Sequence, residues 1–107
     1  MLIEESPPLH DGVCFHCQQA AEKYLKAFLQ EHSTPFRRTH DLEELLDLAV
    51  ILDAALKGLR RGLRFLSNFA VDYRYPGKSA TKRRSNSAAR WAERIRQEIR
   101  KRLTLRP

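Results

Sequence analysis

Five polar side chains recur at spacings of three and four residues within the first third of this 107-residue chain. They are His16, Gln19, Lys23, Lys26 and Gln30. In an α-helix this spacing places side chains on one face, here called the polar column. An imidazole, two amides and two ammonium groups can all donate hydrogen bonds, and the column contains no carboxylate to neutralise its lysines. The polar column therefore suits an anion, although the solvated face of an amphipathic helix has the same pattern.

The same stretch carries an apolar face that predicts a helix packed against the rest of the domain. That face comprises Val13, Cys14, Cys17, Ala21, Tyr24, Leu25 and Phe28. Asp11 can cap a helix over residues 12–31. Pro7 and Pro8 should end any earlier helix, so residues 1–11 are expected to form an irregular or short N-terminal segment.

Three further helices are expected at residues 41–50, 53–74 and 86–103. Thr39 or Asp41 can cap the first of these helices and Asp53 the second, and Glu44 has the reciprocal capping spacing to Asp41. Leu56, Leu59, Leu63 and Leu66 repeat at spacings of three and four, as in packed helices. Gly58 and Gly62 in the same segment indicate a closely approaching helix.

Ser85 or Ser87 can cap the last helix. The chain thus predicts one all-α domain over residues 1–107, an antiparallel, up-and-down four-helix bundle.

Charge is divided sharply along the chain, whose formal net charge is +7. Residues 1–56 hold four Lys/Arg and ten Asp/Glu, a formal charge of −6, whereas residues 57–107 hold sixteen and three, a charge of +13. Such a basic half points to an acidic partner: nucleic acid, a phosphate-bearing ligand or an acidic protein surface.

Three ordered motifs give the chain a family resemblance. FHCQQAAEKYLKAFL at residues 15–29, THDLEELL at 39–46 and DYRYPG at 72–77 resemble the HEPN family of small helical domains, over residues 12–103. The resemblance implies a helical bundle that is usually dimeric and that works on nucleotides or RNA. It also implies a separate minimal nucleotidyltransferase as partner, in a toxin–antitoxin-like system.

On this resemblance, the ligand-binding candidates are drawn from all three motifs. They are His16, Gln19, Lys23, Lys26, His40, Tyr73, Arg74 and Tyr75. Lysine and arginine would contact phosphate, and the tyrosines could stack on a base. His40 can equally be a hydrogen-bonded residue at a helix start, and Arg74 can equally form an ion pair with Asp72.

Residues for catalysis are not identified. In ribonuclease branches of the family, four to six residues separate an arginine from a following histidine. No arginine here precedes a histidine at that spacing, because Arg37 and Arg38 are too close to His40. No metal-binding pattern and no cofactor motif is present, and the pair Cys14 and Cys17 is interpreted as core packing.

Three functional hypotheses follow from these observations. The first is a noncatalytic nucleotide- or RNA-binding module that acts with a nucleotidyltransferase; the others are a ribonuclease toxin with a non-standard site and a structural dimerisation module. We expect a homodimer, because the short N-terminal segment and the broad apolar surface of the third helix leave more nonpolar surface than one small bundle covers. No apolar run approaches the ~20 residues of a membrane span, and no signal layout begins the chain, so a cytoplasmic protein without membrane contact is expected.

Overall fold

The computed structural model describes residues 7–70 and 81–103, and these residues form helices joined by short connections. Four α-helices run over Pro7–Glu31 (α1), Leu42–Leu52 (α2), Arg60–Leu66 (α3) and Lys82–Arg100 (α4). Two short 3₁₀ helices, Ala54–Leu59 (η2) and Ser67–Phe69 (η3), flank α3. No strand occurs within the described ranges, so the all-α prediction is confirmed.

Helix α1 is longer than the sequence predicted, because it begins at Pro7 rather than after the proline pair. Proline has no N–H to donate, but the first N–H groups of any helix have no intrahelical acceptor. A proline pair is therefore compatible with a first turn. The expectation of an irregular segment is wrong for residues 7–11, and residues 1–6 lie outside the described part of the chain.

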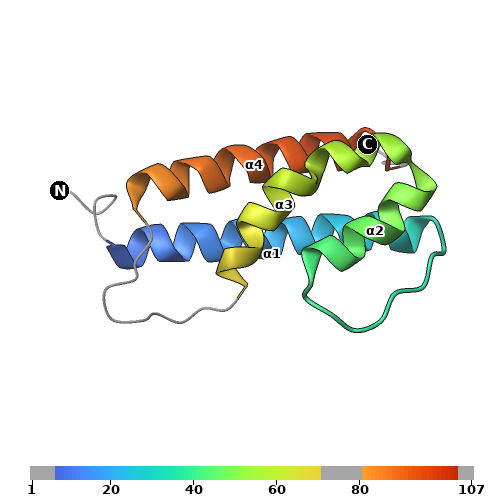
Figure 1. The fold of residues 1–107 in the computed structure, drawn as a ribbon, viewed down its shortest axis with the longest axis horizontal. Coiled ribbons are helices and arrows are strands. Elements are labelled where there is room, and N and C mark those ends of the chain that lie inside the picture. The colour runs from blue at the N-terminus through green and yellow to red at the C-terminus, as the bar shows by residue number, and fades with distance from the viewer. Residues whose placement is uncertain (1–6, 71–80, 104–107) are drawn as a thin grey trace.

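The order of helix directions differs from an up-and-down bundle. Figure 1 shows α1 and α4 side by side and running the same way, with residues 32–41 carrying the chain back along the molecule before α2 begins. Near the N-terminal ends of both helices, His10 Nδ1 of α1 lies 3.3 Å from Ser85 Oγ of α4. In an up-and-down bundle the first and last helices would be antiparallel. The ten-residue connection after α1 is long enough to allow the observed direction.

The start of α2 is fixed by Asp41, as predicted. Its carboxylate accepts hydrogen bonds from the backbone N–H groups of Glu43 and Glu44 at 3.0 and 3.2 Å. The reciprocal half of the capping box is not formed. Instead, Asp41 N–H donates to the Thr39 hydroxyl, and the Glu44 carboxylate accepts two hydrogen bonds from Arg37 at 2.6 and 2.7 Å.

The third predicted helix is divided into η2, α3 and η3. Asp53 ends α2 and caps η2 by accepting a hydrogen bond from Ala55 N–H, so the predicted break is confirmed. The four leucines whose spacing predicted a packed helix are all buried: Leu56, Leu59, Leu63 and Leu66. Residues 71–74, which the prediction included, lie outside the described residues.

Helix α4 starts four residues earlier than predicted. Its cap is Thr81, whose hydroxyl accepts a hydrogen bond from Arg84 N–H at 3.1 Å, and not Ser85 or Ser87. Ser85 is buried, and its hydroxyl donates to the Lys82 carbonyl oxygen at 2.9 Å. The helix therefore includes the basic residues 82–84, which precede its predicted start, because threonine is also an effective N-cap.

Candidate anion-binding surface

The polar column lies on α1, and most of it faces solvent. His16, Gln19, Lys23 and Gln30 are exposed, whereas Lys26 is half-buried. Each lies three or four residues from the next, so their side chains follow one side of the helix. The opposite side of α1 enters the core through Leu25 and Phe28. All five residues belong to α1, so the helix sets their spacing, and α1 itself is held by packing against α2, α3 and α4.

Glu22 connects the polar column to a distant part of the chain. Its carboxylate accepts a hydrogen bond from Lys26 Nζ at 2.9 Å and lies 2.9 and 3.0 Å from His40 Nδ1. His40 precedes α2, so this contact holds the α1–α2 connection against α1. The expectation that no carboxylate neutralises the column is wrong for Lys26. The signal was present in the sequence, because Glu22 and Lys26 have the i,i+4 spacing of helical ion pairs.

The electrostatics of this cluster favour an ionised carboxylate. Burial raises the pKa of Glu22, but hydrogen bonds from Lys26 and His40 outweigh burial and hold the pKa below its ordinary value. Lys26 Nζ also lies 5.9 Å from the centre of the Phe36 ring. Lys26 is therefore held in a structural cluster, whereas Lys23 keeps an exposed ammonium group with no carboxylate contact among the described residues.

Three ligand-binding candidates come from the third family-like motif: Tyr73, Arg74 and Tyr75. They lie outside the described residues, so their role stays a prediction. The structure thus brings His40 to α1 through Glu22 and keeps His16, Gln19, Lys23 and Lys26 on one helix. Whether the tyrosines and Arg74 complete the same surface is a separate prediction.

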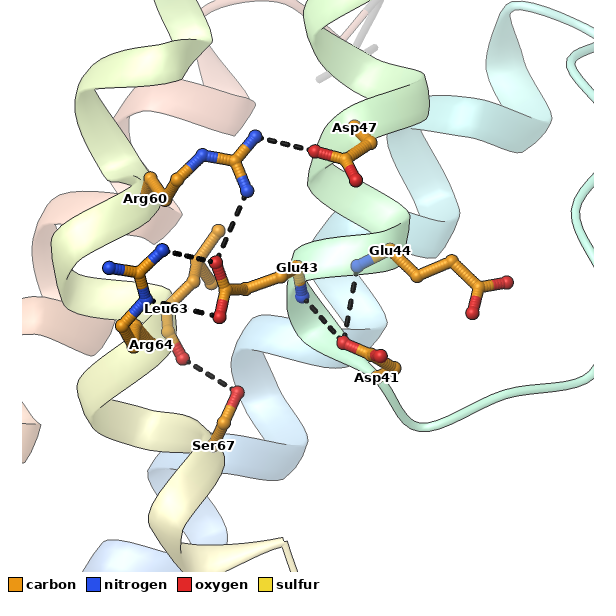
Figure 2. A network of polar contacts seen from close by, with 8 residues as sticks. All are labelled: Asp41, Glu43, Glu44, Asp47, Arg60, Leu63, Arg64 and Ser67. Atoms are coloured by element: carbon orange, nitrogen blue, oxygen red, sulfur yellow. Dashed lines mark hydrogen bonds and ion pairs between the residues drawn. The ribbon is translucent and has the colours of Figure 1, made fainter.

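Two arginines of the basic half are occupied by acidic side chains of α2. Figure 2 shows Arg60 and Arg64 of α3 pointing toward Glu43 and Asp47. Arg64 donates to both Glu43 oxygens at 3.0 and 3.2 Å, and Arg60 bridges Glu43 and Asp47. These hydrogen bonds hold the pKa of Glu43 below its ordinary value. Both arginines therefore join α2 to α3 and are not free to bind a ligand.

Several other exposed lysine and arginine side chains are not paired with a carboxylate of the described residues. Within residues 7–70 and 81–103, the exposed Lys and Arg side chains that contact no carboxylate are Lys23, Arg38, Lys57, Arg61, Arg83, Arg84, Arg90, Arg94 and Arg100. Five of these nine belong to α4, so the predicted basic half is represented mainly by the exposed side of this helix.

The cysteines occupy the positions expected of packing residues. Cys14 is buried in the core and Cys17 packs against it, both as free thiols. Burial, and then the neighbouring Cys17, raises the pKa of the Cys14 thiol to about 11. A thiol with so high a pKa is a poor nucleophile near neutral pH. Among the described residues, no group of three or more His, Cys, Asp or Glu side chains is placed to hold a metal ion.

The fold and surface define an all-helical domain with a polar α1 face and a strongly cationic α4. A family model described as the HEPN domain matches residues 2–102, nearly the whole chain. The chain belongs to the HEPN domain family. Searches of curated proteins and of solved structures gave no match.

None of the described helices is both long enough and apolar enough to cross a bilayer. The longest, α1, carries the polar column along its exposed side.

Proposed function

We propose that this HEPN domain is a noncatalytic module that binds a nucleotide or RNA through phosphate contacts. It acts with a separate minimal nucleotidyltransferase in a toxin–antitoxin-like system. The observation that carries the proposal is the contact of His40 with Glu22, at 2.9 and 3.0 Å. It joins two family-like segments, residues 15–29 and 39–46, at the edge of the polar column.

The chemistry of this surface suits a phosphate. His16, Gln19 and Lys23 present an imidazole, an amide and an ammonium group to solvent over two turns of α1. Each group can donate a hydrogen bond to a phosphate oxygen, and the ammonium group adds charge attraction. Glu22 is occupied by Lys26 and His40, so it leaves the charge of Lys23 uncompensated.

Binding of a fluorescently labelled single-stranded RNA, followed by anisotropy, tests the proposal. Lys23→Ala should weaken binding by about tenfold if the ammonium group contacts phosphate directly. Arg100→Ala is the matched control, because Arg100 is also exposed and free of carboxylate contacts but lies on α4. Equal losses in both variants would mean general attraction to a cation-rich surface. Arg74→Ala, outside the described residues, is expected to behave like Lys23→Ala.

The pairing of Glu22 with His40 also favours a second candidate, a ribonuclease with a non-standard site. A carboxylate that holds His40 Nδ1 leaves the other ring nitrogen available as a base, and the His40 side chain is 79% exposed. We favour the noncatalytic function because the Arg-to-His spacing of ribonuclease branches is absent. Purified protein should leave bound RNA intact, and metal-independent cleavage that His40→Ala abolishes would establish the ribonuclease instead.

We further propose a cytoplasmic homodimer. The apolar surface predicted on the third helix is partly covered, because Trp91 of α4 packs on the Gly62 side of α3. Exposed apolar surface lies instead at the end of α2, where Ile51 and Leu52 are 80% and 40% exposed. A purely structural dimerisation module uses the same surface, and it would show dimers without RNA binding. Co-purification with a minimal nucleotidyltransferase tests the proposed partner.

A further inference from the structure

We infer that α4 carries a second phosphate-binding site, built around Trp91, for one nucleoside phosphate unit of RNA or of a free nucleotide. Ser87, Arg90, Trp91 and Arg94 line an open hollow of about 280 Å³ on this helix. These side chains occupy successive turns and none belongs to the polar column. A hollow of this size is at the low end for ligand sites and suits a single nucleotide unit rather than a larger molecule.

The indole of Trp91 is held in a fixed position by α3. Gly62 has no side chain, and a Cβ at that position would lie 2.1, 2.3 and 2.7 Å from three carbons of the Trp91 ring. The indole therefore packs directly on the backbone of α3. Trp91 is nevertheless only half-buried, so part of the ring is open to solvent. A supported aromatic ring that is partly open to solvent can contact a base.

Two guanidinium groups border this ring, and neither contacts a carboxylate of residues 7–70 or 81–103. The guanidinium carbon of Arg94 lies 5.2 Å from the Trp91 ring centre, and Arg90 Nη2 donates to Ser87 Oγ at 3.4 Å. The nearby carboxylate of Glu93 is turned away, because it accepts hydrogen bonds from Arg96 and Gln97, both at 3.0 Å.

The carboxylate of Glu98, one turn further on, is occupied as well. It accepts hydrogen bonds from Lys101 and Arg102 at 3.1 and 3.0 Å. Both acidic residues of α4 are thus hydrogen-bonded to other side chains, and neither contacts Arg90 or Arg94, so the hollow keeps two positive charges within the described part of the chain.

The arrangement matches the chemistry of a nucleoside phosphate. Arg90 and Arg94 can donate to phosphate oxygens as charge-assisted hydrogen bonds, with the Ser87 hydroxyl as a further donor. The attached base can stack on the indole or on the guanidinium plane of Arg94, since RNA bases stack on both kinds of surface. An acidic peptide would satisfy the cations but would not use the stacked planar groups. The inference rests on the proposed nucleotide- or RNA-binding function and adds a second contact to it.

The chain contains a built-in probe of this hollow, because Trp91 is its only tryptophan. Selective excitation of tryptophan during titration with 5′-AMP and with an eight-nucleotide oligouridylate should show saturable quenching. The double variant Arg90→Ala/Arg94→Ala should weaken the quenching by about tenfold or more, while Arg100→Ala on the same helix should leave it unchanged. Quenching by both probes indicates a nucleotide site, and quenching by the oligomer alone indicates an RNA-backbone site. Circular dichroism verifies that the variants keep their helices.

The results that would refute the α4 site differ from those that would refute the proposed function. If labelled RNA binds and Lys23→Ala weakens it, but neither probe quenches Trp91, the α4 site is wrong and the proposed function stands. If quenching occurs and depends on Arg90 and Arg94 while Lys23→Ala has no effect, the site is correct and the polar column is not the RNA surface. Quenching by polyglutamate with the affinity of the oligouridylate, or quenching unchanged in the double variant, would overturn the inference.

Discussion

Replacing Gly62 with alanine tests how tightly α3 and α4 pack. The added Cβ would lie 2.1 Å from the nearest carbon of Trp91, whereas ordinary contacts begin at 3.4 Å. The indole would have to retreat by about 1.3 Å, as the difference between these distances shows. Overpacking of this kind costs about 1–3 kcal/mol, and the better helix propensity of alanine returns about 0.5–1 kcal/mol. We therefore expect a net destabilisation of up to about 2.5 kcal/mol.

Thermal and urea unfolding followed by circular dichroism measure this effect. Each kcal/mol lost should lower the Tm by about 4–8 °C in a domain of this size. Gly58→Ala is the matched control, since its Cβ would meet only the flexible end of Arg94 at 3.7 Å, and it should be neutral or slightly stabilising. In a Trp91→Ala background, Gly62→Ala should lose its cost. An equal cost in both backgrounds would refute the contact between Gly62 and the indole.

Two further predictions concern Glu22 and the exposed end of α2. The folded-state pKa of Glu22 lies below the ordinary 4.5, because hydrogen bonds from Lys26 and His40 outweigh the effect of burial. Its contribution to stability is thus present above pH 4.5 and is lost as the pH falls through the lower folded-state pKa. Urea unfolding at pH 7 and pH 3 should show a larger loss for the native chain than for Glu22→Gln, and equal losses would contradict the cluster. Ile51→Asp should convert a dimer of twice the chain mass into a monomer by light scattering, and an unchanged dimer would place the interface elsewhere.

The sequence predicted helix starts and buried positions correctly where a single residue type determines them. Asp41 and Asp53 are the caps expected of them, and the leucines at 56, 59, 63 and 66 are buried as their spacing indicates. Helix boundaries were predicted wrongly where the local sequence allows two different starting points. Pro7 could end one helix or begin another, and both Thr81 and Ser85 are acceptable caps. Helix direction depends on the path of residues 32–41, which periodicity does not encode.

In the candidate site, too, contacts within one helix were predicted and contacts between distant segments were not. Helical spacing predicted that His16, Gln19 and Lys23 share one exposed side of α1. It did not predict that His40 joins them, because that contact depends on how the connection after α1 folds back onto Glu22. Helical spacing also did not predict that the indole of Trp91 lies half-buried beside two arginines that contact no carboxylate of the described residues. The glycine at position 62 indicated the close approach of a helix but not which side chain would occupy the space.

The salt dependence of RNA affinity tests the central claim, that the α1 surface contacts phosphate directly. Each phosphate neutralised on single-stranded nucleic acid contributes about −0.7 to the slope of log affinity against log salt. Lys23→Ala should therefore reduce the magnitude of that slope by about 0.7, and Arg100→Ala should leave it unchanged. A slope that Lys23→Ala does not alter, or that both variants reduce equally, would contradict a phosphate contact at the polar column.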